Sequence, residues 1–269
     1  MASPIVKVMT VAGSDSGAGA GIQADLKTIA SLGGYGTSII TAVTAQNTRR
    51  VVSAFELPIE MIQQQFDAVI TDIGTDVVKT GMLSSSAVID ALVGKLREHN
   101  VKQLVVDPVM VSKGGDRLLQ KEALDALKTK LFPLASLVTP NVEEAGVIVG
   151  RKLENLDDIR AASEEIVAMG AKACVVTGGI YPGPATDFLY DGSEFKAFSG
   201  GRIASNNTHG TGCTFASASA VYIARGESVK SAVAQAKRYV TNAIKAAYTV
   251  GTGYGPLNHF HEWMPKPEA

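Results

Sequence analysis

The stretch Ile5-Val-Lys-Val-Met-Thr-Val11 and the loop after it, Ala12-Gly-Ser-Asp-Ser-Gly-Ala-Gly-Ala-Gly21, decide the fold class. The first part is apolar and rich in β-branched residues, which is typical of a buried strand. The second part is a glycine-rich loop, and the amphipathic residues 20–32 predict a helix after it. The stretch therefore begins a β-α-β unit, with its loop at the carboxyl end of a strand, where ligands bind.

The same alternation of strand and helix patterns continues along the chain. Expected strands are at 5–11, 38–44, 77–80, 103–107, 137–139 and 173–177. Expected helices are at 20–32, 59–70, 86–99, 121–131, 157–169 and 228–247. Several strands are apolar almost throughout, as expected of strands covered on both faces. The pattern predicts an α/β fold with a mainly parallel, doubly wound sheet.

One segment departs from this pattern. Two alternating runs, 186–190 and 194–198, flank Asp191-Gly-Ser193, and a tight Asp-Gly turn between such runs predicts a β-hairpin. We expect antiparallel strands at one sheet edge, and we expect a homodimer that covers this edge. No repeat or long linker interrupts the chain, so we expect one domain over residues 1–269.

Composition limits the possible functions. Glycine is in excess, with 27 of 269 residues, against about 7% in an average protein. The formal net charge of −1 argues against a nucleic-acid binder, which is usually basic. Two cysteines make no disulfide framework, and we find neither a signal peptide nor an apolar run long enough for a membrane span. We expect a cytoplasmic protein without membrane or nucleic-acid partners.

The glycine clusters match neither of two common nucleotide motifs. A dinucleotide fingerprint would need glycine at position 22, where Ile22 stands, and a P-loop motif occurs nowhere. The second cluster, Asn207-Thr-His-Gly-Thr-Gly-Cys-Thr214, leads into a predicted helix, so its N–H groups would form an anion hole. At that position we expect a lowered pKa for the Cys213 thiol. A third loop, Thr177-Gly-Gly179, follows another strand and would add N–H groups.

Polar residues also follow the expected strands. Asp107, Asn141 and Glu144 have the side chains to reach Mg²⁺ directly or through its waters, although Asn141 and Glu144 equally fit a capping box. Gln46 carries an amide that can read a heteroaromatic ring edge. Asp25 and Lys237 have the plainer interpretation of charges on helix surfaces.

The histidines of the sequence are less informative. His209 fits the simple role of shaping its loop. His259 and His261 lack the helical spacing and the further partners that a zinc site needs, so we reject zinc there.

Several motifs together resemble the ribokinase-like superfamily, and within it the hydroxymethylpyrimidine and phosphomethylpyrimidine kinases. The resembling segments are 12–28, Thr44-Ala-Gln-Asn-Thr48, Lys79-Thr-Gly-Met-Leu83, Val106-Asp-Pro-Val-Met110, Thr139-Pro-Asn-Val-Glu-Glu-Ala145, 207–214 and Gly255-Pro-Leu-Asn-His-Phe-His261. They run in one order along almost the whole chain. The resemblance implies a three-layer α/β/α fold and a transferase of thiamine biosynthesis. It implies that ATP phosphorylates 4-amino-5-hydroxymethyl-2-methylpyrimidine to the monophosphate and then to the pyrophosphate.

The resemblance also assigns roles to single residues. The pyrimidine pocket is expected to comprise Gly13, Asp25, Gln46, Met82 and Val109. The catalytic anion hole is expected to comprise Cys213, Gly210 and Gly212. Residues for ATP and its magnesium are expected to be Asp107, Asn141, Glu144, Thr177, Gly179, Thr208, Thr211 and Lys237. Asp107 and Glu144 are the expected magnesium ligands, through water.

Two positions depart from the family pattern, and two other functions remain open. Thr177 stands where many of these kinases have lysine, so a charge on the ATP phosphates is absent or comes from elsewhere, and Arg50 replaces a usual glycine. A pyridoxal kinase of the same subgroup is the nearest alternative. The amide of Gln46 favours the aminopyrimidine. Ser112 also favours it, because the dual-activity relatives have a lid cysteine at that position. A binding module without catalysis would lack the magnesium or anion-hole residues, and both sets are present.

Overall fold

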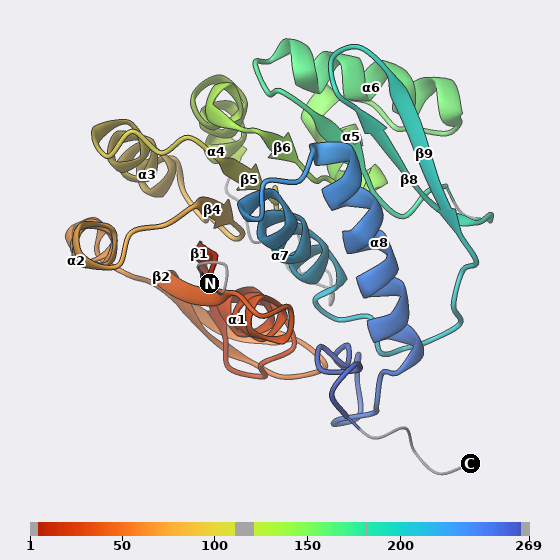
Figure 1. The fold of residues 1–269 in the computed structure, drawn as a ribbon, viewed down its shortest axis with the longest axis horizontal. Coiled ribbons are helices and arrows are strands. Elements are labelled where there is room, and N and C mark those ends of the chain that lie inside the picture. Colours follow the sequence, from red (N-terminus) through yellow and green to blue (C-terminus); the bar gives the residue numbers. More distant parts are fainter. Residues whose placement is uncertain (1–4, 111–120, 181, 265–269) are drawn as a thin grey trace.

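The computed structural model describes residues 5–110, 121–180 and 182–264. Nine strands in this part of the chain form one sheet in the order β3-β2-β1-β4-β5-β6-β7-β8-β9 (Figure 1). The strands are β1 (Lys7–Asp15), β2 (Tyr35–Gln46), β3 (Val51–Glu56), β4 (Val77–Thr80), β5 (Leu104–Val106), β6 (Leu137–Val138), β7 (Cys174–Val176), β8 (Ala185–Tyr190) and β9 (Phe195–Gly200). Every expected strand is confirmed.

The central strands are parallel and the edges are antiparallel. Strands β2, β1, β4, β5, β6 and β7 pair in parallel. The expected hairpin is confirmed as β8 and β9, which run antiparallel beside β7. At the opposite edge β3 pairs antiparallel with β2, and the sequence analysis did not predict this strand. Two antiparallel edges therefore flank the parallel centre.

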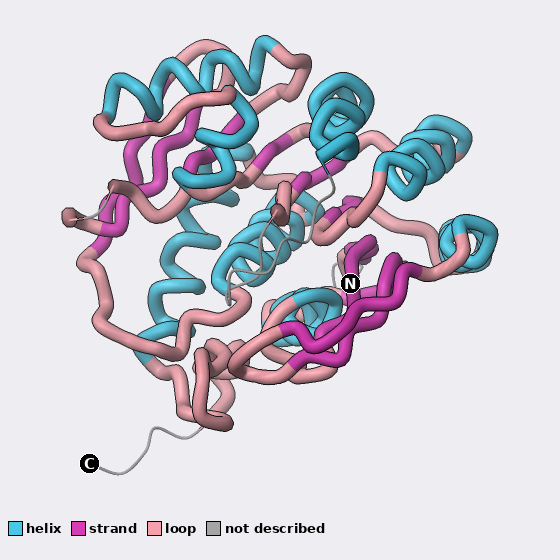
Figure 2. The backbone as a smooth tube through the Cα atoms, turned by 180° about the vertical axis from the view of Figure 1, so that it is seen from behind, coloured by secondary structure: helices cyan, strands magenta, loops and turns pink. Residues whose placement is uncertain are grey.

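Helices cover both faces of this sheet (Figures 1 and 2). They are α1 (Gly21–Ser31), α2 (Ile59–Asp72), α3 (Ser86–Glu98), α4 (Lys121–Ala126), α5 (Val142–Val149), α6 (Leu156–Ala168), α7 (Thr211–Ala224) and α8 (Val229–Lys245). One apolar layer joins α2 to α6 with the sheet, and the other joins α1, α7 and α8. The three-layer α/β/α architecture is confirmed.

Alternating strand residues supply the two apolar layers. In β4, Val77 faces the layer of α7 and Val78 the layer of α3, and both are fully buried. Adjacent side chains of a strand point to opposite faces, so a parallel strand covered on both sides must be apolar at every position. Cys174 in β7 belongs to the α6 side and is fully buried, so this cysteine is a core residue.

Side-chain caps mark where four of the helices begin, and Asn141 at α5 is one of them. Ser85 and Ser228 accept hydrogen bonds from the first turns of α3 and α8, and Asn155 forms a full capping box at α6. The expected helix 121–131 is only partly regular. Helix α4 passes into a π-helical turn, η1 (Leu127–Leu131), and a 3₁₀ turn, η2 (Phe132–Leu134), in which Pro133 ends the helical segment.

Candidate functional site

The N-terminus of α7 lies at the carboxyl-terminal end of the parallel strands. The two glycine loops touch there. Gly210, the residue before α7, has φ +83°, and a Cβ atom at this position would collide with the carbonyl oxygen of Gly19. On β1, a Cβ at Gly13 would collide with the side chain of Met82. The contact at Gly210 needs glycine, because it meets rigid backbone, whereas the flexible end of Met82 can shift away from Gly13. The glycine before α7 thus serves the close approach of the two loops.

Asp15 organises the first glycine loop. Its Oδ1 accepts the N–H of Gly17 at 2.8 Å, and its Oδ2 accepts those of Gly19 at 3.1 Å and Ala20 at 2.9 Å. The Nε2 atom of His209 lies 2.9 Å from the same Oδ2. Burial alone would raise the pKa of Asp15, but the hydrogen bonds from His209 and the backbone lower it below its ordinary value. The carboxylate thus joins the two glycine loops as an anion.

Gln46, at the end of β2, lies beside this junction. Its Nε2 is 3.3 Å from His209 Nε2, and its Oε1 is 3.2 Å from Thr44 Oγ1. Its backbone N–H donates to Ser16 Oγ, which in turn donates to the Gln46 carbonyl. The structure therefore holds the amide between the first glycine loop and the loop before α7.

Asp107 occupies the centre of the site, and burial raises its pKa to about 6, against the opposing charge of Lys79. Its Oδ2 lies 3.8 Å from Lys79 Nζ and has no hydrogen-bond partner within the described residues. A Cβ at Gly212 would lie 3.7 Å from its Oδ1, so α7 begins directly against this carboxylate. The Val109 N–H donates to the Asp107 carbonyl at 2.9 Å, which holds Val109 beside it.

Asn141 and Glu144 form the capping box that their spacing allows. The Asn141 side chain accepts the Glu144 N–H at 2.9 Å, and Glu144 Oε2 accepts the Asn141 N–H at 2.9 Å, which is a complete capping box. Burial and the nearby charge of Asp107 raise the pKa of Glu144 to about 8. The cap therefore also places the Glu144 carboxyl group close enough to Asp107 for the two to influence each other.

The expected lowering of the Cys213 pKa is wrong. Cys213 lies in the first turn of α7, where the helix dipole favours a thiolate. Burial nevertheless raises its pKa to about 12, and the positive charge of Lys79 is offset by the negative charges of Asp107 and Asp25. The thiol accepts a hydrogen bond from the Gly21 N–H and donates one to the Asp107 carboxylate. At neutral pH this sulfur is a protonated thiol.

Asp25 does not face an open pocket in this structure. It is fully buried, and its carboxylate accepts from Thr10 Oγ1 at 2.6 Å, Ser217 Oγ at 2.7 Å and Lys79 Nζ at 2.8 Å. These donors occupy the carboxylate, so it neutralises Lys79 beneath Cys213. The reading of Asp25 as a surface charge on its helix is likewise excluded, because the side chain points into the protein.

The third glycine loop lies at the end of β7. Thr177 bridges Asn141, and its N–H donates to the Pro140 carbonyl at 2.8 Å. A Cβ at Gly179 would lie 2.8 Å from the Pro184 carbonyl oxygen, where β8 approaches. Lys237 Nζ pairs with Asp187 at 3.0 Å, and Asp187 accepts the Gly178 N–H at 2.8 Å. The structure thus links Lys237 to this loop through Asp187.

The remaining predicted residues close the loop before α7. Thr208 offers its carbonyl to the N–H of Thr211 at 3.3 Å and to its hydroxyl at 2.7 Å. Both threonines are half-buried beside Gly210. Their bonds tighten the turn that leads into the helix, so its first N–H groups point out of the helix end.

Three residues of this region were not assigned roles from the sequence. Asp15 sits inside the glycine loop as a short polar residue typical of turns, and Lys79 is an isolated charge in an apolar strand, which is a readable signal because buried lysine needs a partner. Arg202 donates to the Gly178 carbonyl at 2.8 Å and to the Gly183 carbonyl at 2.9 Å. No local pattern predicts this contact, which forms only when β9 returns to the third loop. Ser112 lies outside the described residues.

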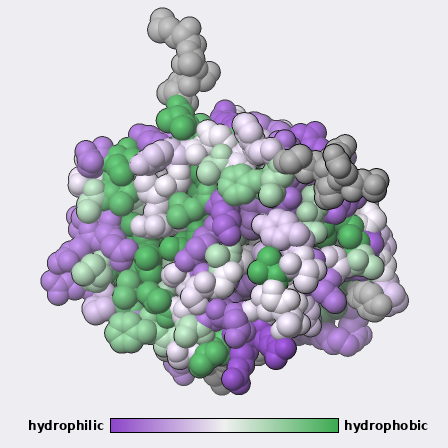
Figure 3. Space-filling model, turned by 90° about the horizontal axis from the view of Figure 1, so that it is seen from below, coloured by the Kyte–Doolittle hydropathy of each residue, from purple (hydrophilic) through white to green (hydrophobic). Residues whose placement is uncertain are grey.

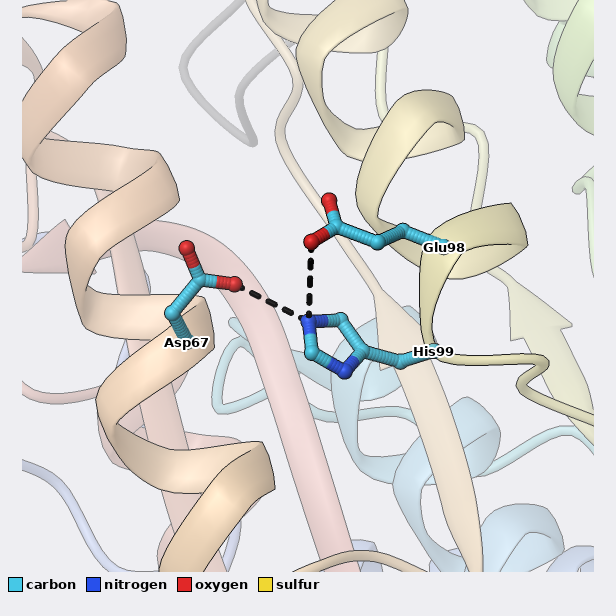
Figure 4. A group of neighbouring side chains, drawn as sticks. All are labelled: Asp67, Glu98 and His99. Carbon is cyan, nitrogen blue, oxygen red and sulfur yellow. Dashed lines mark hydrogen bonds and ion pairs between the residues drawn. The ribbon is translucent and has the colours of Figure 1, made fainter.

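A second group of potential ligands joins α2 and α3 (Figure 4). His99 Nε2 lies 3.0 Å from Asp67 Oδ1 and 3.9 Å from Glu98 Oε1. Lys95 Nζ is 2.6 Å from Asp67 and 3.0 Å from Glu98. The ammonium group of Lys95 already pairs with both carboxylates, so we interpret the group as a clamp between two helices and not as a metal centre.

The donor set around Asp107 fits magnesium. Two carboxyl groups, Asp107 and Glu144, lie near each other, and one buried carboxylate oxygen lacks a hydrogen-bond partner among the described residues. Mg²⁺ prefers oxygen ligands and keeps several of its waters, so it needs few protein carboxylates.

Comparisons with known proteins identify the family of this chain. Residues 15–258 match the family model of phosphomethylpyrimidine kinase. The hydroxymethylpyrimidine/phosphomethylpyrimidine kinase of Streptomyces coelicolor is 48% identical over 94% of this chain and 93% of its own length. The thiamine biosynthesis bifunctional protein ThiED of Geobacter sulfurreducens is 51% identical over 95% of this chain, but the chain spans only 52% of that protein.

Solved structures show the same fold. The Clostridium difficile phosphomethylpyrimidine kinase is 44% identical, with a TM-score of 0.79 over 89% of this chain and 99% of that one. The Staphylococcus aureus pyridoxal kinase in complex with AMP-PCP and pyridoxal is 34% identical, with a TM-score of 0.89 over 97% and 96%. Among the described residues, no helix is long and apolar enough to cross a membrane. The family match and the ribokinase-like fold confirm the resemblance: the chain belongs to the phosphomethylpyrimidine kinase family.

Proposed function

We propose that this protein transfers phosphoryl groups from ATP to 4-amino-5-hydroxymethyl-2-methylpyrimidine, first to the monophosphate and then to the pyrophosphate of thiamine biosynthesis. The observation that carries the proposal is that three groups meet at the carboxyl-terminal end of the parallel strands. They are the amide of Gln46, the buried carboxylate of Asp107 and the first turn of α7. Relatives named for this activity share the fold and nearly half of the residues.

Each group has a role in phosphoryl transfer. The substrate hydroxyl oxygen forms a bond to the γ-phosphorus and releases its proton to solvent, the bond from that phosphorus to the β-phosphate oxygen breaks, and ADP leaves. Positioning and charge neutralisation provide most of the rate in such a loose transition state. The N–H groups of Gly212 and Cys213 at the start of α7 are aimed to stabilise the transferred phosphoryl oxygens. Because the Cys213 thiol is protonated at neutral pH, it serves as a hydrogen-bonding group in the anion hole and not as the resting base.

Asp107 and Glu144 are the residues that would hold magnesium, directly or through its waters. When bound, Mg²⁺ supplies positive charge to the nucleotide phosphates. Thr177, Gly179, Thr208, Thr211, Asn141 and Lys237 remain our proposed ATP contacts. Arg202 and Lys237 both reach the third glycine loop, so they are the cations available where Thr177 replaces lysine.

Pyridoxal phosphorylation is the second candidate, because the Staphylococcus aureus pyridoxal kinase shares the fold closely. Pyridoxal is also a flat hydroxymethylated heterocycle. The amide of Gln46 favours the aminopyrimidine, since one amide can both donate to a ring nitrogen and accept from an exocyclic amine.

The experiment for the proposed function is mass spectrometry of the products. Purified protein with ATP, Mg²⁺ and the aminopyrimidine is expected to yield the monophosphate and then the pyrophosphate, with one ADP for each step. ADP formation without either product, or no ADP at all, would reject the proposal. The latter result would favour a binding module without catalysis.

We further propose that residues 1–269 act as one catalytic domain in the cytoplasm. One sheet carries all nine described strands, and both cysteines are free thiols.

We also propose a homodimer, which forms through the edge of the sheet opposite the hairpin. Val43 and Phe55 pair across β2 and β3, and Phe55 is 66% exposed. Figure 3 shows apolar side chains gathered on the side where these strands lie in Figure 1. Sedimentation of wild type and Phe55→Glu tests this dimer, which the variant should dissociate.

A further inference from the structure

His209 stands between the residue that organises the first glycine loop and the residue proposed to read the substrate. Its Nε2 atom lies 2.9 Å from Asp15 Oδ2 and 3.3 Å from Gln46 Nε2. The side chain of His209 is 11% exposed and that of Asp15 is 3% exposed. One ring nitrogen therefore faces both a carboxylate and an amide, in a place that is largely buried from solvent.

The carboxylate decides where the proton lies. Asp15 is an anion that accepts from three backbone N–H groups, so it can offer His209 only lone pairs. A lone pair on Nε2 at 2.9 Å from this oxygen would be repulsive. The Nε2 atom must therefore carry a hydrogen, whether the ring is neutral or charged, and this N–H donates to Asp15.

This proton also dictates the orientation of the Gln46 amide. An N–H of His209 cannot accept a hydrogen bond from the amide NH₂ group, but it can donate to the amide oxygen. Rotation of the amide by 180° places Oε1 toward His209 and Nε2 toward Thr44 Oγ1. The Thr44 hydroxyl donates to the Ser14 carbonyl at 2.9 Å, so its oxygen is free to accept from the amide NH₂. Both contacts of the amide, with His209 and with Thr44, then join a donor to an acceptor.

In this orientation each end of the amide keeps one group for a ligand. The NH₂ group has a second N–H, and Oε1 has a second lone pair. We propose that His209 is a specificity-determining residue, whose Nε2–H fixes the polarity of the Gln46 amide so that the pocket accepts a ring nitrogen next to an exocyclic amine. The inference deepens the proposed function and rests on it. An amide of the opposite polarity would place donor against donor at the amine.

The backbone around His209 is built to hold this geometry. Its N–H donates to the Gly255 carbonyl at 3.0 Å, and it bridges Pro256 in the C-terminal segment. The same segment contacts the loop that follows Gln46, where the Tyr254 N–H donates to the Thr48 carbonyl at 2.8 Å. The C-terminal segment thus fixes both His209 and the loop beyond Gln46 in one register.

The test compares two substrates in four variants. The substrates are the aminopyrimidine and the same hydroxymethylpyrimidine without its exocyclic amine. His209→Leu removes the donor, and His209→Gln restores an N–H donor. His99→Leu is the matched control, because His99 Nε2 lies 3.0 Å from Asp67 in the clamp of α2 and α3.

His209→Leu is expected to raise KM for the aminopyrimidine roughly tenfold or more, with KM for the amine-free analogue and for ATP changed less than about threefold. His209→Gln should recover most of the preference, and His99→Leu should keep all of it. Equal losses for both substrates would show a merely structural role and overturn the inference. Thr44→Val removes the acceptor at the other end of the amide, so it should reduce the same preference even if His209→Leu does not fold.

A spectroscopic signature is independent of turnover. The ¹⁵N resonance of His209 Nε2 should report a protonated nitrogen at pH 7 to 8, and an unprotonated Nε2 would overturn the inference. If wild-type protein phosphorylates neither pyrimidine, the proposed function fails. Equilibrium binding of the two pyrimidines then decides the inference alone, and a change below about twofold in their affinity ratio on His209→Leu would refute it.

Discussion

Lys79 Nζ lies 2.8 Å from Asp25 Oδ1, and both side chains are completely buried. Burial alone would lower the pKa of Lys79, but the negative charges of Asp25 and Asp107 raise it. The ammonium group therefore stays charged beneath the site. Removal of one partner of such a buried pair strongly lowers the free energy of unfolding, because the other partner is left as an unpaired charge.

Lys79→Met should reduce the free energy of unfolding by about 3–5 kcal/mol, measured by denaturant titration. The double variant Asp25→Asn with Lys79→Met should recover part of this loss, since no charge remains buried between the two positions. Lys95→Met, which breaks a partly exposed ion pair between α3 and α2, is the control and should have a far smaller effect. A loss below about 1 kcal/mol for Lys79→Met would contradict the role of the pair.

The sequence revealed the architecture because the architecture follows from local patterns. Apolar strands such as 77–80 and helical spacing such as 157–169 give their structure within one segment. The short strand β3 was missed because four of its six residues are exposed, so burial supplies no alternating pattern. This strand forms because its backbone pairs with the edge of β2.

The electrostatics of the site could not be predicted in the same way. The helix dipole near Cys213 is visible in the sequence, whereas burial beside Asp107 and Asp25 arises only when β5, α1 and α7 meet. The pairing of Asp15 with His209 joins residues 194 positions apart. Glycine clusters predicted where the loops lie, but not which side chain holds them together.

Cys213 should react slowly with iodoacetamide at pH 7. Because its pKa is raised to about 12, the thiolate fraction and the alkylation rate should rise about tenfold per pH unit up to pH 10 without a plateau. Mass spectrometry of the labelled peptide measures this rate, with Cys213→Ala as the control for label on Cys174. A plateau near pH 8 would instead show an ordinary or activated thiol.

Glu144 should make the protein less stable as pH rises from about 5 to 8. Its pKa is about 8 in the folded protein against an ordinary 4.5, so the folded state holds a proton that the unfolded state has released. This contribution is complete below pH 4.5 and is lost as pH passes through 8. Glu144→Gln should flatten that part of the pH profile in urea titrations, and the exposed Glu143→Gln should not. Parallel profiles for wild type and Glu144→Gln would contradict the shift.

Gly210→Ala should disrupt the junction of the two glycine loops. Gly226 is its matched control, because both residues have φ +83° but only Gly210 faces a neighbouring backbone, at Gly19. Gly226→Ala introduces only backbone strain, which should lower the free energy of unfolding by about 1–2 kcal/mol in thermal or denaturant unfolding. Gly210→Ala should lose more stability and should also lower kcat. Equal effects of the two substitutions would mean that the close approach is unimportant.

The specificity of turnover tests the central claim most directly. The values of kcat/KM for the aminopyrimidine and for pyridoxal, measured by ADP release with saturating ATP and Mg²⁺, decide between the two heterocycles. The account predicts a clear preference for the aminopyrimidine, with its monophosphate accepted as the second substrate. A kcat/KM for pyridoxal that exceeds that of the aminopyrimidine by tenfold would contradict it.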